Sequence, residues 1–155
     1  MLTVSDGVSE GTREDLSGAA LAGLLDGDGY EVERHVVADD RDSIAATLER
    51  LVAGCDLVLT TGGTGFGPRD VTPEATRQVL DREAPGLAEA IRADARAKTP
   101  HGMLSRGLAG IARRCVIVNL PGSPGGARDG YATIRDALPH AVRLLAGETT
   151  AHRQT

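Results

Sequence analysis

The sequence predicts an α/β protein of three layers, in which helices cover both faces of a mostly parallel central sheet. Apolar segments of strand length alternate along the chain with amphipathic segments of helix length, as in right-handed βαβ units. The segments 56–61 and 114–120 each contain a continuous apolar run, at 57–59 and 115–118, which is typical of strands buried on both faces. Because the chain has 155 residues, 41% of them hydrophobic, we expect one domain over residues 1–147 and a flexible tail at 148–155.

The first half of the chain contains three of the expected strands. Residues 2–5 form a short strand, which is followed by a turn at 6–7 and by a helix whose capping box is Thr12-x-x-Asp15. Residues 30–37 supply the next strand. The strand at 56–61 follows a second helix, which places four apolar side chains on one face: Ile44, Leu48, Leu51 and Val52.

Two glycines, Gly18 and Gly23, lie inside the first expected helix. In a helix interior, glycine is destabilising by about 1 kcal/mol relative to alanine. We therefore expect each of them to lie where a neighbouring element packs closely.

The second half of the chain continues the alternation. Thr72-Pro73 predicts an N-cap followed by a proline at the first helical position, and residues 85–98 form a further amphipathic helix. Residues 99–107 are expected to be an exposed loop ahead of the buried strand at 114–120. The last helices are interrupted at Pro139, since proline removes a backbone donor and clashes with the preceding turn.

Composition argues against several classes of function. Aromatic residues make up 2% of the chain and the formal net charge is −5, so the chain offers neither stacking surfaces nor a basic face for nucleic acid. No signal peptide or long apolar run is evident, and Cys55 and Cys115 lack CxxC spacing, which indicates a reduced cytoplasmic protein without a membrane partner. The histidines show no zinc-ligand spacing, and none is placed to activate Ser5 as a nucleophile.

Unusual loops follow the expected strands. Because the carboxyl ends of parallel strands meet at one edge of a sheet, where ligands bind in open α/β proteins, we expect these loops to converge. They are Ser5-Asp6-Gly7, Asp39-Asp40, residues 60–70 and residues 119–126. The proline- and glycine-rich run within the last of them is explained equally well as the turn between a strand and a helix.

The loop that follows the strand at 56–61 predicts a phosphate or carboxylate site. Its glycines, at 62, 63, 65 and 67, let backbone N–H groups approach a ligand, and the helix beginning at Pro73 directs its positive end toward the same space. The loop is not a Walker motif, because Pro68-Arg69 stands where lysine and a hydroxyl residue are required. It also lacks the GxGxxG spacing of a dinucleotide site.

Asp39 and Asp70 are candidate ligands for Mg²⁺. Carboxylates beside a phosphate cradle most often hold this cation, which takes one or two protein oxygens and keeps several waters. In the alternative, structural interpretation, Asp39 or Asp40 caps the second helix and Asp70 holds the turn before Thr72. We favour the cap for Asp40, whereas both interpretations of Asp70 stay open on spacing alone.

Four stretches occur together over nearly the whole chain: Leu2-Thr-Val-Ser-Asp6 with Asp15-x-Ser-Gly18, Val37-Ala-Asp-Asp40, Thr60-Thr-Gly-Gly-Thr-Gly65 with Arg69-Asp-Val-Thr-Pro-Glu-Ala75, and Met103-Leu-Ser-Arg106 with Asn119-Leu-Pro-Gly-Ser-Pro124. In these stretches the chain resembles the MogA/MoaB family of molybdenum cofactor biosynthesis proteins and the G domain of gephyrin. The third stretch is highly specific to the wider molybdopterin-binding fold, whereas Pro-Gly-Ser-Pro alone is a weak signal.

The resemblance implies a MogA-like fold, a homotrimer or a hexamer, and transfer of AMP from ATP to molybdopterin with release of pyrophosphate. It implies that Asp39 and Asp70 are the catalytic residues and hold Mg²⁺. It also implies an anion cradle made by Gly62, Gly63, Thr64 and Gly65. The pterin and nucleotide pocket would be lined by Ser5, Asp6, Ser105, Arg106, Asn119, Pro121, Gly122, Ser123 and Pro124. Other enzymes of molybdenum cofactor synthesis are the expected partners.

Two alternatives to an adenylyltransferase stay open. A catalytically silent, MoaB-like oligomer would bind the pterin as a carrier or scaffold. CinA-type relatives hydrolyse nucleotide derivatives on the same fold, although they normally carry a second domain, for which we expect no room in this chain. The presence of both Asp39 and Asp70 favours catalysis.

Overall fold

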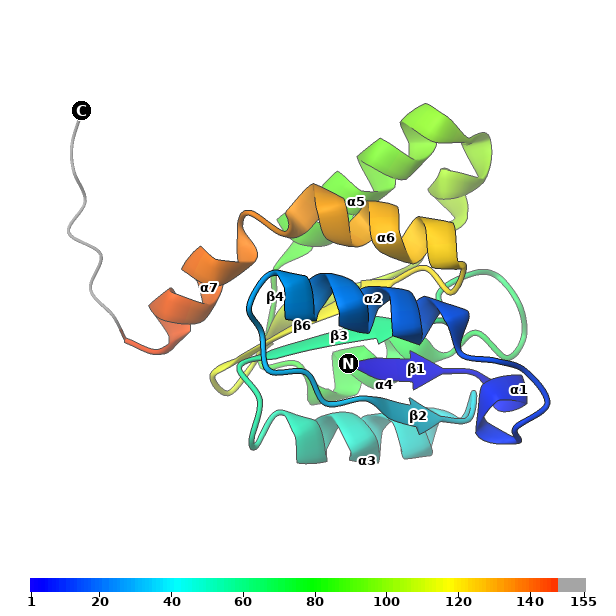
Figure 1. The fold of residues 1–155 in the computed structure, drawn as a ribbon, viewed down its shortest axis with the longest axis horizontal. Coiled ribbons are helices and arrows are strands. Elements are labelled where there is room, and N and C mark those ends of the chain that lie inside the picture. The colour runs from blue at the N-terminus through cyan, green and yellow to red at the C-terminus, as the bar shows by residue number, and fades with distance from the viewer. Residues whose placement is uncertain (148–155) are drawn as a thin grey trace.

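The computed structural model describes residues 1–147 and has a six-stranded sheet at its centre (Figure 1). The strands are β1 (Leu2–Val4), β2 (His35–Val37), β3 (Leu57–Thr61), β4 (Arg82–Glu83), β5 (Ala109–Ala112) and β6 (Cys115–Leu120). They lie in the order β2-β1-β3-β6-β5-β4. β1 pairs in parallel with β2 and β3, and β3 pairs in parallel with β6, whereas β5 is antiparallel to both β6 and β4.

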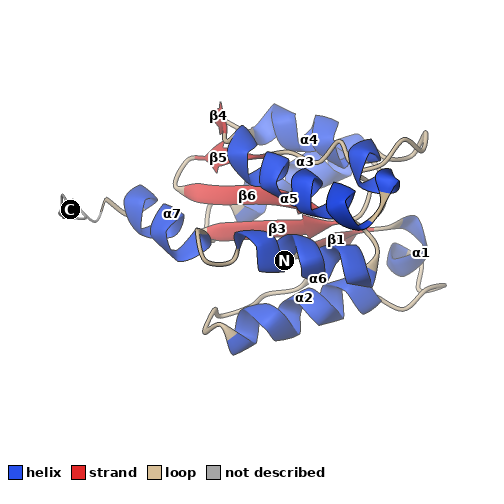
Figure 2. Ribbon diagram, turned by 90° about the horizontal axis from the view of Figure 1, so that it is seen from above, coloured by secondary structure: helices blue, strands red, loops and turns tan. Residues whose placement is uncertain are grey.

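Helices lie on both faces of this sheet (Figure 2). They are α1 (Asp6–Ser9), α2 (Leu16–Gly27), α3 (Arg41–Leu51), α4 (Thr72–Val79), α5 (Pro85–Lys98), the 3₁₀ helix η1 (Pro100–Leu104), α6 (Pro124–Ile134) and α7 (Leu138–Leu145). α3 and α4 pack together on one face, and α2, α6 and α5 form the layer on the other. The predicted three-layer α/β/α class is therefore confirmed.

Alternate residues of the central strands face the two helical layers. On β6, Val116, Val118 and Leu120 pack in the core with α2, α5 and α6. Cys115 and Ile117 pack in the core with α3 and α4. All of these side chains are buried, so β6 carries apolar residues on both of its faces rather than on alternate positions, with Asn119 as its one polar residue.

The antiparallel edge made by β4 and β5 is absent from the sequence-based prediction. β5 reads Ala-Gly-Ile-Ala, which carries little of the β-branched or aromatic signal of a strand. Packing explains the glycine, because a Cβ on Gly110 would lie 2.5 Å from the carbonyl oxygen of Arg82. Local strand propensity therefore gives little signal for this edge, which depends on a tertiary contact at Gly110.

Three predicted element boundaries are wrong. β2 begins at His35 rather than at residue 30, because β1 is only three residues long and its first residue pairs with His35. The N-cap of α2 is Asp15, whose Oδ1 accepts the N–H of Gly18 at 2.8 Å, and Thr12 is not part of this cap. Thr72 is the first residue of α4 rather than its cap, and its hydroxyl donates to the carbonyl of Gly62 at 2.9 Å.

The remaining elements follow the prediction more closely. α5 has the predicted bounds, and the loop expected at 99–107 contains η1. The interruption predicted at Pro139 is wrong in its position: the last helices are separated at residues 135–137, and Pro139 lies in the first turn of α7, where its missing N–H is tolerated. The tail expected at 148–155 lies outside the described residues.

Gly18 is closely packed, as expected, whereas the same expectation for Gly23 is wrong, so these two interior glycines of α2 predict opposite stability effects. A Cβ on Gly18 would lie 2.1 Å from Oδ2 of Asp15 and 2.4 Å from Oγ1 of Thr3, whereas a Cβ on Gly23 meets no atom within 4 Å. We expect Gly18→Ala to lower the free energy of unfolding by about 1–3 kcal/mol through overpacking and damage to the cap. Gly23→Ala, the matched control, should raise it by about 0.5–1 kcal/mol. Urea unfolding of both variants checks this, and equal effects would contradict it.

Candidate active site

The loops at the carboxyl ends of β1, β2, β3 and β6 border one cleft with a volume of about 660 Å³. The predicted site residues that line this cleft are Ser5, Asp39, Gly62, Gly63, Asp70, Gly122, Ser123 and Pro124. The start of α2 and the residues just before it contribute lining residues that the sequence-based prediction did not include: Arg13, Glu14, Leu16 and Ser17. Asp15-x-Ser-Gly18 is one of the stretches that carried the family resemblance, so a signal for this side of the cleft was present.

Residues 62–70, here called the glycine loop, begin with a backbone turn that only glycine adopts readily. Gly62 and Gly63 have positive φ angles of 104° and 63°. A Cβ on Gly62 would lie 2.2 Å from the carbonyl oxygen of Val4, and a Cβ on Gly63 would lie 2.3 Å from Oγ1 of Thr72. Steric contact with β1 and α4 therefore requires both glycines.

In the glycine loop, the carbonyl groups of the peptides are hydrogen-bonded to the protein, whereas several of the N–H groups are left unpaired. Four consecutive carbonyls accept hydrogen bonds: those of Gly62 and Gly63 from Thr72, at 2.9 and 3.1 Å, and those of Thr64 and Gly65 from Arg106, at 2.8 and 2.7 Å. Among residues 1–147, the N–H groups of residues 63–66 donate to no protein acceptor. Successive unpaired N–H groups in such a turn form an anion-binding cradle.

Two carboxylates lie in the cleft beside this cradle. Oδ2 of Asp39 accepts the N–H of Asp6 at 2.8 Å, and Oδ2 of Asp70 accepts the N–H of Gly67 at 2.7 Å. Within the described part of the chain, Oδ1 of Asp39 and Oδ1 of Asp70 accept no hydrogen bond. Burial raises the pKa of Asp39 above its ordinary value, and the negative charges of Asp6 and Asp70 add to this effect.

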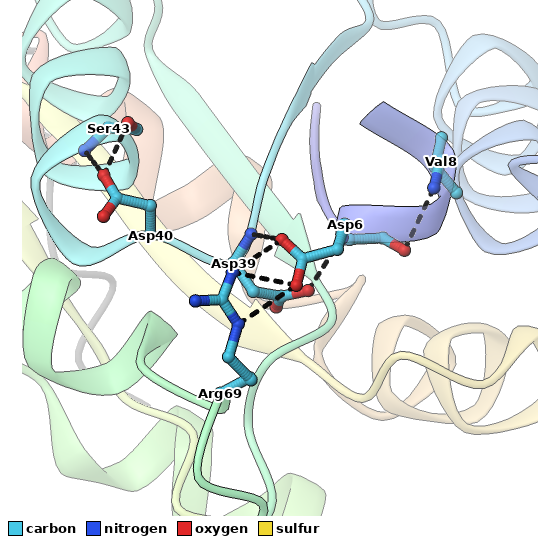
Figure 3. A network of polar contacts seen from close by, with 7 residues as sticks. Asp6, Val8, Asp39, Asp40, Ser43 and Arg69 are labelled. Atoms are coloured by element: carbon cyan, nitrogen blue, oxygen red, sulfur yellow. Dashed lines mark hydrogen bonds and ion pairs between the residues drawn. The ribbon is translucent and has the colours of Figure 1, made fainter. Parts of the chain in front are cut away.

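Asp6 has a different role from these two acids, because both of its oxygens are engaged (Figure 3). Its Oδ1 accepts the N–H of Asp39 at 2.9 Å, and Nη2 of Arg69 donates to both oxygens at 2.9 Å. The hydrogen bond from Asp39 and the guanidinium of Arg69 hold the pKa of Asp6 below its ordinary value. Asp6 therefore joins the loop after β1 to the loop after β2 and to the glycine loop.

Asp40 caps α3, as favoured from the sequence. Its Oδ1 accepts both the N–H and the hydroxyl of Ser43, at 2.9 and 2.6 Å (Figure 3). These hydrogen bonds lower the pKa of Asp40. The adjacent acids Asp39 and Asp40 are thus separated by the chain, one facing the cleft and the other the helix.

Other predicted site residues lie around the cleft rather than along its lining. Asn119 is 3% exposed, and its amide nitrogen donates to the hydroxyls of Thr60 and Thr76 at 3.0 and 2.9 Å. The carbonyl of Pro121 accepts the hydroxyl of Thr61 at 2.7 Å. Four further predicted residues do not contribute to the lining: Thr64, Gly65, Ser105 and Arg106.

The donor set suits a cation that needs few protein ligands. Within residues 1–147 no group of three or more His, Cys, Asp or Glu side chains is arranged to hold a metal. Asp39 and Asp70 nevertheless each offer one carboxylate oxygen without a hydrogen bond to the described protein. Mg²⁺ is commonly bound by one or two carboxylates together with water and substrate phosphates, so the residues present fit it.

The chain matches the family described as “Probable molybdopterin binding domain” over residues 1–140. It belongs to this family. Molybdopterin adenylyltransferase of Helicobacter pylori strain J99 is 40% identical over 152 residues, covering 95% of this chain and 86% of that protein. The molybdenum cofactor synthesis protein cinnamon of Drosophila melanogaster is 41% identical over 160 residues, and the match covers 100% of this chain but only 26% of that longer protein.

Solved structures of this family superpose on the whole described fold. The molybdopterin biosynthesis enzyme MoaB from Thermus thermophilus is 48% identical, with a TM-score of 0.88 and coverage of 94% of both chains. A structure of MogA is 44% identical, with a TM-score of 0.89, and covers 93% of this chain and 96% of its own. The MogA-like fold expected from the sequence is therefore confirmed. None of the helices described for residues 1–147 has the length and apolarity needed to cross a membrane.

The raised pKa of Asp39 predicts that this acid destabilises the fold near neutral pH. The unfolded chain releases its proton at the ordinary value of 3.8, whereas the folded protein releases it at higher pH, so wild-type stability falls as pH rises through that interval. We expect Asp39→Asn to have a higher Tm than the wild type at neutral pH, with the difference shrinking as pH falls toward 3.8.

The matched control for this experiment is the neighbouring Asp40→Asn. Because the pKa of Asp40 is lowered in the folded protein, its ionised form stabilises the fold above pH 3.8. Asp40→Asn should therefore have a lower Tm than the wild type at neutral pH. Thermal unfolding at a series of pH values measures both variants, and a lower Tm for Asp39→Asn at neutral pH would contradict the electrostatic argument.

Proposed function

We propose that this protein is an Mg²⁺- and ATP-dependent molybdopterin adenylyltransferase. The observation that carries the proposal is the pairing of an anion cradle with two free carboxylate oxygens, at Asp39 and Asp70, beside one cleft. Relatives that bear the name molybdopterin adenylyltransferase match nearly the full chain, which supports the same activity.

The proposed reaction joins two anions. A terminal phosphate oxygen of molybdopterin attacks the α-phosphorus of ATP, a new P–O bond forms, and the bond to the pyrophosphate leaving group breaks. The protein needs to supply no covalent chemistry, so its contribution is positioning and neutralisation of charge. The unpaired N–H groups of residues 63–66 would bind phosphate oxygens, and the N-terminus of α6, behind Ser123, would place a second positive pole at the cleft.

Asp39 and Asp70 would hold the magnesium ion in this proposal. When bound, the cation neutralises phosphate charge and aligns the reacting oxygens. Asp6 and Arg69 act on Asp39 from outside the metal site, because the N–H of Asp6 fixes one carboxylate oxygen and leaves the other free. Gly67 orients Asp70 in the same way.

A silent pterin carrier is the second candidate, since a MoaB enzyme is among the most similar solved structures, at 48% identity. A carrier requires an anion cradle but not two carboxylates beside it, because acidic groups near a phosphate are repulsive unless a cation is bound. The two free carboxylate oxygens therefore favour catalysis over carriage.

A homotrimer or hexamer, a cytoplasmic location, and contact with other enzymes of molybdenum cofactor synthesis belong to the same proposal. Both cysteines are free thiols, as a reducing compartment requires. Burial raises the pKa of Cys115 to about 12, so this thiol stays protonated and has no part in the proposed chemistry.

Turnover of molybdopterin, ATP and Mg²⁺ tests the proposal, with adenylylated pterin and pyrophosphate followed by chromatography. We expect Asp70→Asn to lower kcat/KM by about 100-fold or more, because a charge-stabilising group at the reacting phosphates is removed. Asp56→Asn, at the opposite end of β3, is the matched control and should retain wild-type activity. Removal of Mg²⁺ by a chelator should abolish product formation. Molybdopterin binding without any product from the wild type would establish the carrier instead.

A further inference from the structure

We propose that Arg106, with Glu74 as its counter-ion, is a positioning residue that clamps the glycine loop and thereby holds Asp70 at the cleft. The catalytic consequence rests on the proposed function. The clamp itself is a feature of the fold and can be tested without any substrate.

Arg106 contacts both ends of the glycine loop. Its backbone N–H donates to the carbonyl of Thr64 at 2.8 Å, and its Nε donates to the carbonyl of Gly65 at 2.7 Å. On the far side of the loop, Nη2 donates to the backbone carbonyl of Asp70 at 2.5 Å. The remaining terminal nitrogen, Nη1, donates to Oε1 of Glu74 in the first turn of α4. The side chain of Arg106 therefore joins Gly65 in the first half of the loop to Asp70 at its end and to the helix that follows.

The loop needs such a clamp because little apolar burial holds its tip. Residues 66–69 are all exposed, and the side chain of Phe66 is 70% exposed. One side-chain bridge from the tip to another loop is the ion pair of Arg69 with Asp6, in which the Arg69 side chain is 64% exposed. Solvent screens such a pair strongly. The Arg106 and Glu74 side chains are 33% and 37% exposed, so their contacts are better shielded.

Only arginine can make this set of contacts. Its guanidinium is planar and presents donors in several fixed directions, whereas a lysine ammonium is a compact point charge on a flexible stem. The two loop carbonyls and the Glu74 carboxylate lie in different directions from the guanidinium and are satisfied at the same time. Lysine would retain the charge beside Glu74 but could not bridge the loop carbonyls in the same way.

The geometry also separates this role from the one implied by the family resemblance, in which Arg106 lines the ligand pocket. Arg106 does not contribute to the lining of the cleft, whereas Asp70, whose carbonyl it holds, does. Its Nε and both terminal nitrogens already donate to protein acceptors. Three of the five N–H groups of the guanidinium are thereby engaged by the loop and by Glu74, and these three bonds make up the side-chain part of the clamp.

Amide hydrogen exchange of the ligand-free protein tests the clamp directly. We expect Arg106→Lys to speed exchange by about 10- to 100-fold at the hydrogen-bonded loop amides of Gly67 and Asp70, without a change in the core strands, because hydrogen bonds from a charged donor that hold the loop are lost. Glu74→Gln, a milder change, should give a smaller acceleration at the same residues. Arg77→Ala is the matched control, because Arg77 lies on the same helix and pairs instead with Glu83 at the surface. Wild-type exchange rates in the loop of Arg106→Lys would overturn the clamp.

Binding of α,β-methylene ATP, with and without Mg²⁺, tests the link to Asp70. In the wild type Mg²⁺ should tighten binding, and Arg106→Lys should reduce that gain by about 10- to 100-fold, as is typical of residues that support a metal ligand. The double variant Arg106→Lys/Asp70→Asn should lose no more than Asp70→Asn alone, because Arg106 acts through Asp70. Additive losses in the double variant would mean that Arg106 does not act through Asp70 and would overturn the proposal.

Steady-state kinetics separate the clamp from the proposed function. With molybdopterin as the varied substrate, we expect Arg106→Lys to lower kcat while leaving KM within about twofold of the wild type, because ground-state binding does not use Arg106. A raised KM with unchanged kcat would instead fit a pocket-lining arginine. If the wild type neither binds the analogue nor forms product, the adenylyltransferase proposal fails, and the exchange experiment still decides whether the clamp exists.

Discussion

The backbone of Gly62 lies against the carboxyl end of β1 with no room for a side chain, and the rest of the cleft depends on this contact. The distance from an added Cβ to the carbonyl oxygen of Val4 would be 2.2 Å, and the N–H of Gly62 donates to the carbonyl of Leu120 at 3.3 Å. Gly122 packs on the other side, where its Cβ would lie 3.1 Å from the Cα of Gly62. The ends of β1, β3 and β6 are therefore drawn together, and the loops that follow them border the same cleft.

From this contact the chain builds a site that is mostly backbone. The carbonyls of residues 62–65 accept hydrogen bonds from Thr72, at the start of α4, and from Arg106. These bonds fix the peptides in an orientation in which their N–H groups, those of residues 63–66, find no acceptor within the turn. A buried or half-buried N–H without an acceptor is unfavourable, which is the usual price of a preformed anion site. Thr72 supports this arrangement, because its hydroxyl donates to the carbonyl of Gly62 in the loop and does not cap the helix.

The sequence predicts those features of the structure that a local pattern determines, but not those that depend on contacts between distant residues. The bounds of α5 and the strands β3 and β6 follow from periodicity and two-sided burial, and Asp39 and Asp70 face the cleft because they follow parallel strands. The β4–β5 edge could not be predicted, since it depends on close packing at Gly110 rather than on strand-forming residues. The roles of Arg106 and Asn119 could not be predicted for the same reason. Their motifs indicate importance, but only partners distant in the sequence, such as Gly65 and Thr60, reveal what each side chain contacts.

The acidic side chains of the cleft and its cradle of N–H groups have opposite effects on a bound anion. Asp6, Asp39 and Asp70 gather within a small region, and Arg69 neutralises Asp6 while Asp39 keeps a raised pKa. A region with uncompensated negative charge repels a polyphosphate, so the cradle of N–H groups alone cannot make the cleft a good anion site. A divalent cation removes this conflict, because the free oxygens of Asp39 and Asp70 are then ligands instead of unpaired charges. The unfavourable state of Asp39 in the free protein and the proposed need for Mg²⁺ therefore have the same physical origin: the cleft is complementary to an anion only together with its cation.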